Sequence, residues 1–127
     1  MPANIEKTRT YAPHKRTCIY LEASFNPFVY VKELRDLGFD VMYDTGRPQV
    51  AETVRMVAAD VLIVWVDNAT PWAWVKIGYA MASGLRIVAI GSRQLPQGMA
   101  ALQEPTWDDL AKNKFLALGD GDFKKEK

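Results

Sequence analysis

The run Val61-Leu62-Ile63-Val64-Trp65-Val66 decides the fold, because every residue in it is apolar. A strand without a polar side must be covered on both faces, which is typical of the middle of a parallel sheet. Shorter apolar runs at residues 17–22, 39–43 and 86–90 predict three further strands. Residues 61–66 are therefore expected to form a central strand of a parallel sheet.

Helical patterns lie between these apolar runs. The first helix is expected to begin after Asn26, a good N-cap residue that is followed by a proline. A second is expected at residues 49–59, with Val50 and Val54 on one face, and a third at about 72–83. Strands and helices that alternate in this way imply right-handed crossovers. They predict an α/β three-layer sandwich around a doubly wound, mostly parallel sheet of about five strands, flavodoxin-like or Rossmann-like.

The end of the chain carries weaker signals. Thr106 and Asp109 have the spacing of a capping box and predict a short helix through Leu110. Residues 115–118 are a candidate fifth strand at the edge of the sheet. The composition along the chain predicts a flexible N-terminal arm, one domain and a frayed tail, at residues 1–16, 17–119 and 120–127.

The composition excludes several classes of function. The 127 residues suffice for one domain, and a net charge of +1 gives no basis for binding nucleic acid or a membrane. The lone Cys18 cannot form an internal disulfide, and no apolar run reaches the roughly 18 residues that span a bilayer. A cytoplasmic protein is the expectation. His14 has no partner cysteines or histidines, and there is no GxGxxG or Walker loop, so neither a metal nor a cofactor is expected.

Ligands bind to doubly wound sheets at the carboxyl ends of the strands. Four segments lie at those ends, at residues 22–28, 43–47, 67–76 and 91–93. The last of them is either a small anion-binding nest or an ordinary loop. A functional site is therefore predicted where these segments meet.

Four short motifs resemble one enzyme family when they are taken in order. They are Ile19-Tyr20-Leu21, Ala58-Ala59-Asp60 before the central strand, Ile77-Gly78-Tyr79-Ala80, and Gly84-Leu85-Arg86-Ile87-Val88. This ordered set resembles the nucleoside 2-deoxyribosyltransferases and the related nucleotide N-glycosidases, over roughly residues 17–91. The resemblance implies a nucleoside or nucleotide ligand, cleavage of its N-glycosidic bond, and a homodimer or higher homo-oligomer.

The resemblance also implies roles for single residues. In the family a glutamate attacks the anomeric carbon and forms a covalent glycosyl intermediate. Tyr20 then corresponds to a tyrosine near the reacting carboxylate, and Glu52 to an acid that positions the sugar or the base. Thr70 and Arg47 are weaker candidates to hold the phosphate of a nucleotide.

The chain departs from the family at the reacting centre. Lys76 occupies the position of the nucleophilic glutamate, and a protonated lysine cannot perform that attack. Trp72 and Trp74 fill a loop that is small in the family, and Glu22 replaces a small residue after the first strand. If strands 17–22 and 61–66 are neighbours, Glu22 and Lys76 face the same cleft and can pair, because a buried lysine needs a carboxylate partner.

Three interpretations of Lys76 stay open at this point. The Glu22–Lys76 pair is a structural replacement for a lost active site, or Lys76 is a deprotonated amine that forms a Schiff base with the sugar. In the third interpretation Glu22 has itself become the nucleophile. The expected function is accordingly a nucleoside 2-deoxyribosyltransferase-like protein with altered or lost chemistry, and the alternative is a non-catalytic nucleotide-binding or protein-interaction module.

The remaining candidates are substrate-binding residues. Asp67, directly after the central strand, is placed either to bind a sugar hydroxyl or to cap the following turn. Trp72 and Trp74 are two residues apart on a helix and cannot share one face, so one can pack inward while the other stacks on a base or a partner subunit. Asn26 completes the set, at the loop after the first strand.

Overall fold

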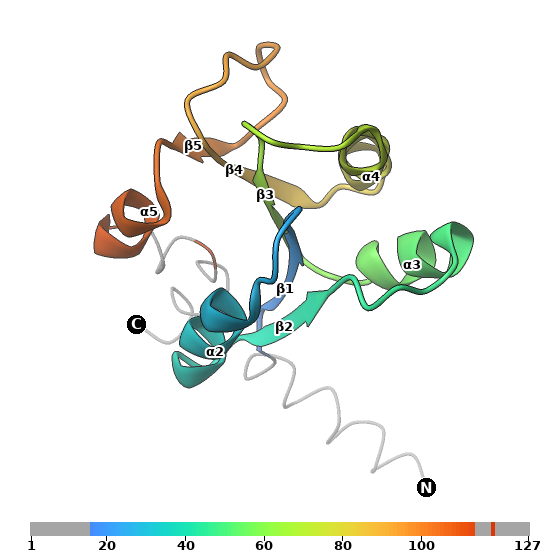
Figure 1. Cartoon of the computed structure of the whole chain (residues 1–127), viewed down its shortest axis with the longest axis horizontal. Coiled ribbons are helices and arrows are strands. Elements are labelled where there is room, and N and C mark those ends of the chain that lie inside the picture. The colour runs from blue at the N-terminus through green and yellow to red at the C-terminus, as the bar shows by residue number, and fades with distance from the viewer. Residues whose placement is uncertain (1–15, 114–117, 119–127) are drawn as a thin grey trace, which may run out of the picture.

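Five parallel strands form a single sheet at the centre of the molecule (Figure 1). This computed structural model describes residues 16–113 and 118. The strand order is β2-β1-β3-β4-β5, which is the flavodoxin-like order, so the predicted fold class is confirmed. The strands are β1 (Cys18–Glu22), β2 (Asp40–Tyr43), β3 (Val61–Trp65), β4 (Arg86–Ile90) and β5 (Leu102–Glu104).

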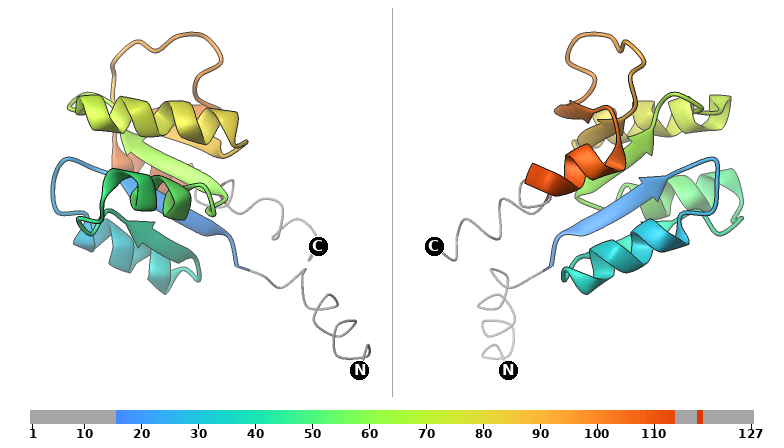
Figure 2. Two further views of the ribbon diagram at one scale, coloured as in Figure 1. Left: turned by 90° about the vertical axis from the view of Figure 1, so that its right-hand side faces the viewer. Right: turned by 60° about the vertical axis from the view of Figure 1, so that its left-hand side comes forward.

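Helices cover both faces of the sheet and complete the three layers. One layer holds α2 (Phe28–Asp36) and α5 (Trp107–Asn113), and the other holds α3 (Gln49–Met56) and α4 (Pro71–Ala82) (Figures 1 and 2). No helix within the described residues combines the length and the apolar character that crossing a membrane requires.

The central strand β3 contributes side chains to the hydrophobic cores on both faces of the sheet. Val61 and Ile63 of β3 belong to the core cluster that packs under α2 and α5. Leu62 and Val64 belong to the opposite cluster, under α3 and α4. Successive side chains of a strand point to opposite faces, so an all-apolar β3 supplies both cores at once. The same alternation places Tyr20 of β1 on the α3–α4 side.

Side-chain oxygens of Thr70 and Asn26 secure the starts of α4 and α2. Thr70 caps α4, with its Oγ1 accepting a hydrogen bond from the Ala73 amide at 3.1 Å, and proline follows at the first helical position. Asn26 stands one residue further out than predicted, because Pro27 takes the cap position of α2. The Asn26 Oδ1 accepts from the Phe28 amide at 2.9 Å and still secures the start of α2.

The C-terminal part differs from the prediction. The fifth strand is Leu102–Glu104, which is too short and too polar to show a strand pattern. Of the predicted strand at 115–118, only Leu118 is described, and it is helical and buried. The predicted cap at Thr106 is confirmed, since its Oγ1 accepts from the Asp109 amide at 3.1 Å. The predicted tail (120–127) lies outside the described residues, as does the predicted arm (1–16) except for Arg16.

Candidate functional site

Five side chains from four elements meet at the carboxyl end of the sheet. β1 supplies Tyr20 and Glu22, the loop after β2 supplies Asp44, α3 supplies Glu52, and α4 supplies Lys76. We call these five residues the Lys76 cluster. Three of them, Tyr20, Glu52 and Lys76, are fully buried. The carboxyl end of the sheet, where a site is predicted, thus holds a dense group of ionisable side chains.

Lys76 stands at the centre of this cluster. Its Nζ lies 2.6 Å from Glu22 Oε1 and 3.0 Å from Asp44 Oδ2. It also donates to the Tyr20 hydroxyl at 3.2 Å. An ammonium group has three N–H donors, and each of them therefore has an acceptor. With 0% of its surface exposed, Lys76 has no face of the amine open to solvent.

The pairing of Glu22 with Lys76 was predicted from the sequence and is confirmed. It follows from the strand order, since β1 lies directly beside β3 and Glu22 is in register with Val64. Glu22 ends β1 at the point where α4 returns over the sheet from the end of β3. Because Glu22 is 7% exposed and Lys76 is fully buried, each charge needs the other as its partner.

Asp44 is a member of the cluster that the sequence interpretation missed. It follows β2 directly, and β2 is the other neighbour of β1, so the carboxyl-end rule places it beside Glu22 once the strand order is known. Its Oδ1 also accepts from the Gly46 amide at 2.8 Å, which fixes the loop. Unlike Glu22, the Asp44 side chain is 36% exposed and retains contact with solvent.

Glu52 forms the second half of the cluster. Its Oε2 accepts from the Tyr20 hydroxyl and, at 3.1 Å, from Arg55 Nη1. Tyr20 thus connects Lys76 to Glu52 through a single hydroxyl. The other oxygen, Oε1, is buried and accepts no hydrogen bond from the described residues, and Arg47 Nε lies 4.0 Å from it. Arg55 is the second residue that the sequence interpretation missed; it lies three residues after Glu52 on α3.

The surroundings shift the pKa values of three members. Burial raises the pKa of Glu22 above its ordinary value, although the hydrogen bond and charge of Lys76 oppose this shift. For Asp44, partial burial acts to raise the pKa, but the hydrogen bonds from Gly46, Lys76 and Trp72 outweigh it and the pKa is lowered. Burial, followed by the hydrogen bond to Glu52, raises the pKa of the Tyr20 hydroxyl far above its usual range. Tyr20 therefore stays neutral at any physiological pH.

Trp72 and Trp74 point to different places, as their spacing predicted. The Trp72 ring lies over Lys76, with its centroid 5.2 Å from Nζ, and its side chain is hydrogen-bonded to Asp44. The Trp74 ring lies under the guanidinium of Arg93, also at 5.2 Å. Trp72 thus adds an aromatic wall to the Lys76 cluster, and Trp74 belongs to the neighbouring loop.

Asp67 is engaged by the loop that follows β4. Its Oδ1 accepts from the amides of Ser92 at 3.1 Å and Arg93 at 2.9 Å, and its Oδ2 accepts from Ser92 at 3.1 Å. Gly91 has φ of 137°, and a Cβ there would lie 2.8 Å from Asp67 Cγ. The backbone amides that form a candidate anion nest thus already bind a carboxylate of the same chain.

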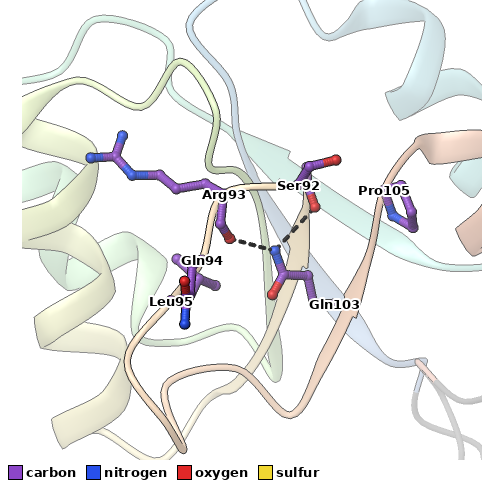
Figure 3. Close-up of a pocket in the computed structure, with 7 residues that line it drawn as sticks. Ser92, Arg93, Gln94, Leu95, Gln103 and Pro105 are labelled. Atoms are coloured by element: carbon purple, nitrogen blue, oxygen red, sulfur yellow. Dashed lines mark hydrogen bonds between the residues drawn. The ribbon is translucent and has the colours of Figure 1, made fainter.

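A shallow hollow lies beside that loop (Figure 3). It encloses about 460 Å³, and Gln103 supports its wall by donating to the carbonyls of Gly91 at 3.0 Å and Arg93 at 2.9 Å. The Arg93 side chain extends away from Gln103 in Figure 3, toward its contact with Trp74. No member of the Lys76 cluster lines the hollow.

The other candidates lie at different points. Thr70 and Asn26 use their side-chain oxygens to start α4 and α2. Arg47 is 53% exposed above Glu52 and is the one phosphate candidate that adjoins the cluster. The structure therefore unites Tyr20, Glu22, Glu52, Lys76, Trp72 and Arg47, and leaves Asn26, Asp67, Thr70 and Trp74 with other contacts.

Comparisons with known proteins leave the family open. No protein-family model matches the chain, and no curated protein matches it. Among solved structures, it is similar to a 3-dehydroquinate dehydratase-like protein from Bifidobacterium longum, with a TM-score of 0.46 and 12% identity over 89% of this chain and 100% of that chain. A similarity this distant carries no argument about function.

Proposed function

We propose that this chain is a nucleoside 2-deoxyribosyltransferase-like protein that has lost glycosyl transfer and acts by binding a partner. The observation that carries the proposal is the state of Lys76. Its Nζ is fully buried and donates to Glu22, Asp44 and Tyr20, at the position where the resemblance expects a nucleophilic carboxylate.

The relation to the family is supported by residues that are distant in sequence. Tyr20 and Glu52 are 32 positions apart, and Tyr20 and Lys76 are 56 apart. The resemblance assigns these three positions to one reacting centre, and the Tyr20 hydroxyl is hydrogen-bonded to both of the other side chains. Such convergence is what the resemblance requires.

The contacts of Lys76 argue against both catalytic interpretations. A Schiff base needs an amine that a sugar can reach, whereas the Lys76 Nζ is fully buried and donates to two carboxylates within 3.0 Å. For Glu22 to act as a nucleophile, a sugar would have to reach a carboxylate that is 7% exposed and already paired at 2.6 Å. The pair fits the first interpretation best, in which a structural ion pair replaces the active site.

Nucleoside or nucleotide binding is the second candidate, and one observation favours it. The buried Oε1 of Glu52 accepts no hydrogen bond within the described part of the chain, and a buried acceptor without a donor is costly. Because Glu52 is 0% exposed, a ligand hydroxyl could supply that donor only if the Arg47 side chain beside it moved aside. Arg47, half-exposed beside it, could then bind a phosphate.

Two measurements separate these possibilities. The full chain is incubated with each deoxynucleoside and 5'-nucleotide, and free base is measured by chromatography. We expect no release. Release that disappears in Lys76→Ala or Glu22→Ala, but persists in the exposed control Lys32→Ala, would overturn the proposal. A thermal stabilisation by a nucleotide that is lost in Arg47→Ala, without base release, would establish the second candidate.

Borohydride reduction tests the Schiff base on its own. Trapping with a deoxynucleoside should leave the Lys76 peptide unmodified when it is analysed by mass spectrometry. A sugar adduct at Lys76 would restore a catalytic role for this lysine.

A further inference from the structure

The loop after β2 places two opposite charges beside the Lys76 cluster. Asp44 Oδ2 lies 3.0 Å from Lys76 Nζ, and Arg47 Nε lies 4.0 Å from Glu52 Oε1. The side chains of Asp44 and Arg47 are 36% and 53% exposed, and we call these two residues the loop pair. The side chains of Lys76 and Glu52 are both 0% exposed. An accessible acid thus lies on a buried cation, and an accessible arginine lies beside a buried anion.

The buried charges are balanced without the loop pair. Lys76 is paired with Glu22 at 2.6 Å, and Glu52 is paired with Arg55 at 3.1 Å. Withdrawal of the loop pair would therefore leave each buried charge with one partner of opposite sign. A buried pair is strongly destabilised only when it loses one of its partners, whereas ion pairs with an exposed partner contribute little. The loop pair can accordingly be exchanged for other groups of the same charge at a small electrostatic cost.

The loop pair fits one of its two positions poorly. The buried Oε1 of Glu52 accepts no hydrogen bond within the described part of the chain. Arg47 Nε, at 4.0 Å, is too far away to donate one. A buried carboxylate oxygen without a donor is costly, so a group that brought an N–H closer would be favoured over the arginine. Asp44, in contrast, is well placed on Lys76.

We propose that the Lys76 cluster binds a small zwitterion, an amino acid, in place of the loop pair. Its carboxylate replaces Asp44 on Lys76, and its ammonium donates to Oε1 of Glu52. The two positions lie close together, because the Tyr20 hydroxyl is hydrogen-bonded to both Lys76 and Glu52. All residues of the loop from 44 to 48 are exposed, and the loop moves aside when the ligand enters. The ligand assignment rests on the proposed function as a binding protein.

Ligands with a single charge fit the cluster less well. A simple carboxylate would replace Asp44 but leave Oε1 of Glu52 without a donor. An amine alone would supply the donor but leave Lys76 without one of its acceptors. A phosphate on Lys76 would carry more negative charge than Asp44 and would lie close to Glu22, which is 2.6 Å from the same Nζ. An amino acid brings one acceptor group and one donor group of the required signs.

Thermal unfolding of the full chain tests the ligand class. Glycine, β-alanine and 4-aminobutyrate carry the same two charges at increasing separation. At about 10 mM, at least one of them should raise the melting temperature by about 2 °C or more. Acetate and ethylamine, with one charge each, should not. Trimethylglycine is the matched control for glycine, because it carries both charges but has no N–H to donate to Glu52.

Calorimetric titration of variants with the stabilising amino acid tests the position. Glu52→Gln retains the shape of the side chain and removes its charge, so it should weaken binding at least about tenfold. Asp36→Asn, on the exposed surface of α2, is the matched control and should leave binding unchanged. Arg47→Ala removes the side chain that competes for Oε1, so it should tighten binding about threefold or more. In a site that binds the phosphate of a nucleotide, Arg47→Ala would act in the opposite direction.

The outcomes separate this inference from the proposed function. A melting temperature that no amino acid raises, or that trimethylglycine raises as much, would overturn the zwitterion site. So would binding that is equally strong in Glu52→Gln. In either case the loss of glycosyl transfer would stand on its own test. Base release from a chain that does bind an amino acid would overturn that loss and retain the zwitterion site.

Discussion

Replacing Lys76 by methionine isolates the charge at the centre of the Lys76 cluster. Methionine retains the unbranched apolar stem, so packing changes little and the ammonium is lost. Glu22, whose side chain is 8% exposed, then stays buried without its partner. Asp44 is less affected, because its side chain is 36% exposed and can be rehydrated.

The expected cost follows from that difference in exposure. Removing one partner of a buried pair typically costs about 3–5 kcal/mol, because a buried charge is left uncompensated. That is a large part of the roughly 5–15 kcal/mol by which a domain is stable. Replacing both partners removes the uncompensated charge, so Lys76→Met with Glu22→Met should be more stable than Lys76→Met alone, by about 2 kcal/mol.

Urea unfolding followed by far-UV circular dichroism measures these free energies, and it avoids the fluorescence of Trp72 beside the mutation. Lys32→Met is the matched control. Lys32 pairs with Asp36 at 3.1 Å on the surface of α2, with both side chains 67% exposed, and its loss should cost less than about 0.5 kcal/mol. A Lys76→Met variant no less stable than this control would refute the reasoning.

Four further predictions concern single residues. Burial raises the pKa of Glu22 above its ordinary 4.5, so the contribution of Glu22 to stability is present below pH 4.5 and is lost as pH rises through the raised pKa. Urea midpoints measured against pH should show this loss in the wild type, and Glu22→Gln should remove it. The pKa of Asp44 lies below 3.8, so its contribution is lost as pH falls, and Asp44→Asn should flatten the profile below pH 3.8. Gly91→Ala should lower the unfolding free energy in urea by about 2 kcal/mol or more, since φ is 137° and the new Cβ would lie 2.8 Å from the Asp67 carboxylate carbon. The control Gly98→Ala, at φ of 83° with no atom nearby, should cost about 1 kcal/mol. Equal costs would refute the steric argument. Thr70→Ala should lower the unfolding free energy by about 1 kcal/mol, with Thr70→Ser largely restoring it, and a serine variant as unstable as alanine would exclude the capping explanation.

The fold could be predicted because its signals are local and long enough to read. Residues 61–66 identified the central strand, and the alternation with helices then predicted the doubly wound parallel sheet that is observed, although not its strand order. The pair of Glu22 with Lys76 could be predicted for a physical reason, since a buried lysine needs an acid and strand adjacency offered one.

The rest of the site depends on contacts that a linear pattern does not encode. Asp44 lies in a short polar loop, and Arg55 is a single charged residue between Val54 and Met56, so both look like ordinary surface residues in the sequence. Their roles depend on how the loop after β2 and helix α3 fold back over β1. The outward turn of Val50 and Val54 was missed for the opposite reason, because an apolar helix face is normally assigned to the core of its own chain.

Because Lys76 is buried, chemical modification of its amine reports transient local opening of the native protein. An acylating reagent can react with an amine only when the amine is accessible, and Lys76 has no exposed surface while Lys32 has a side chain that is 67% exposed. The ratio of their acylation rates in the native protein therefore measures the fraction of molecules in which α4 has lifted from the sheet. Mass spectra of the two peptides over a time course of acylation would give both rates, and their ratio would give the free energy of opening.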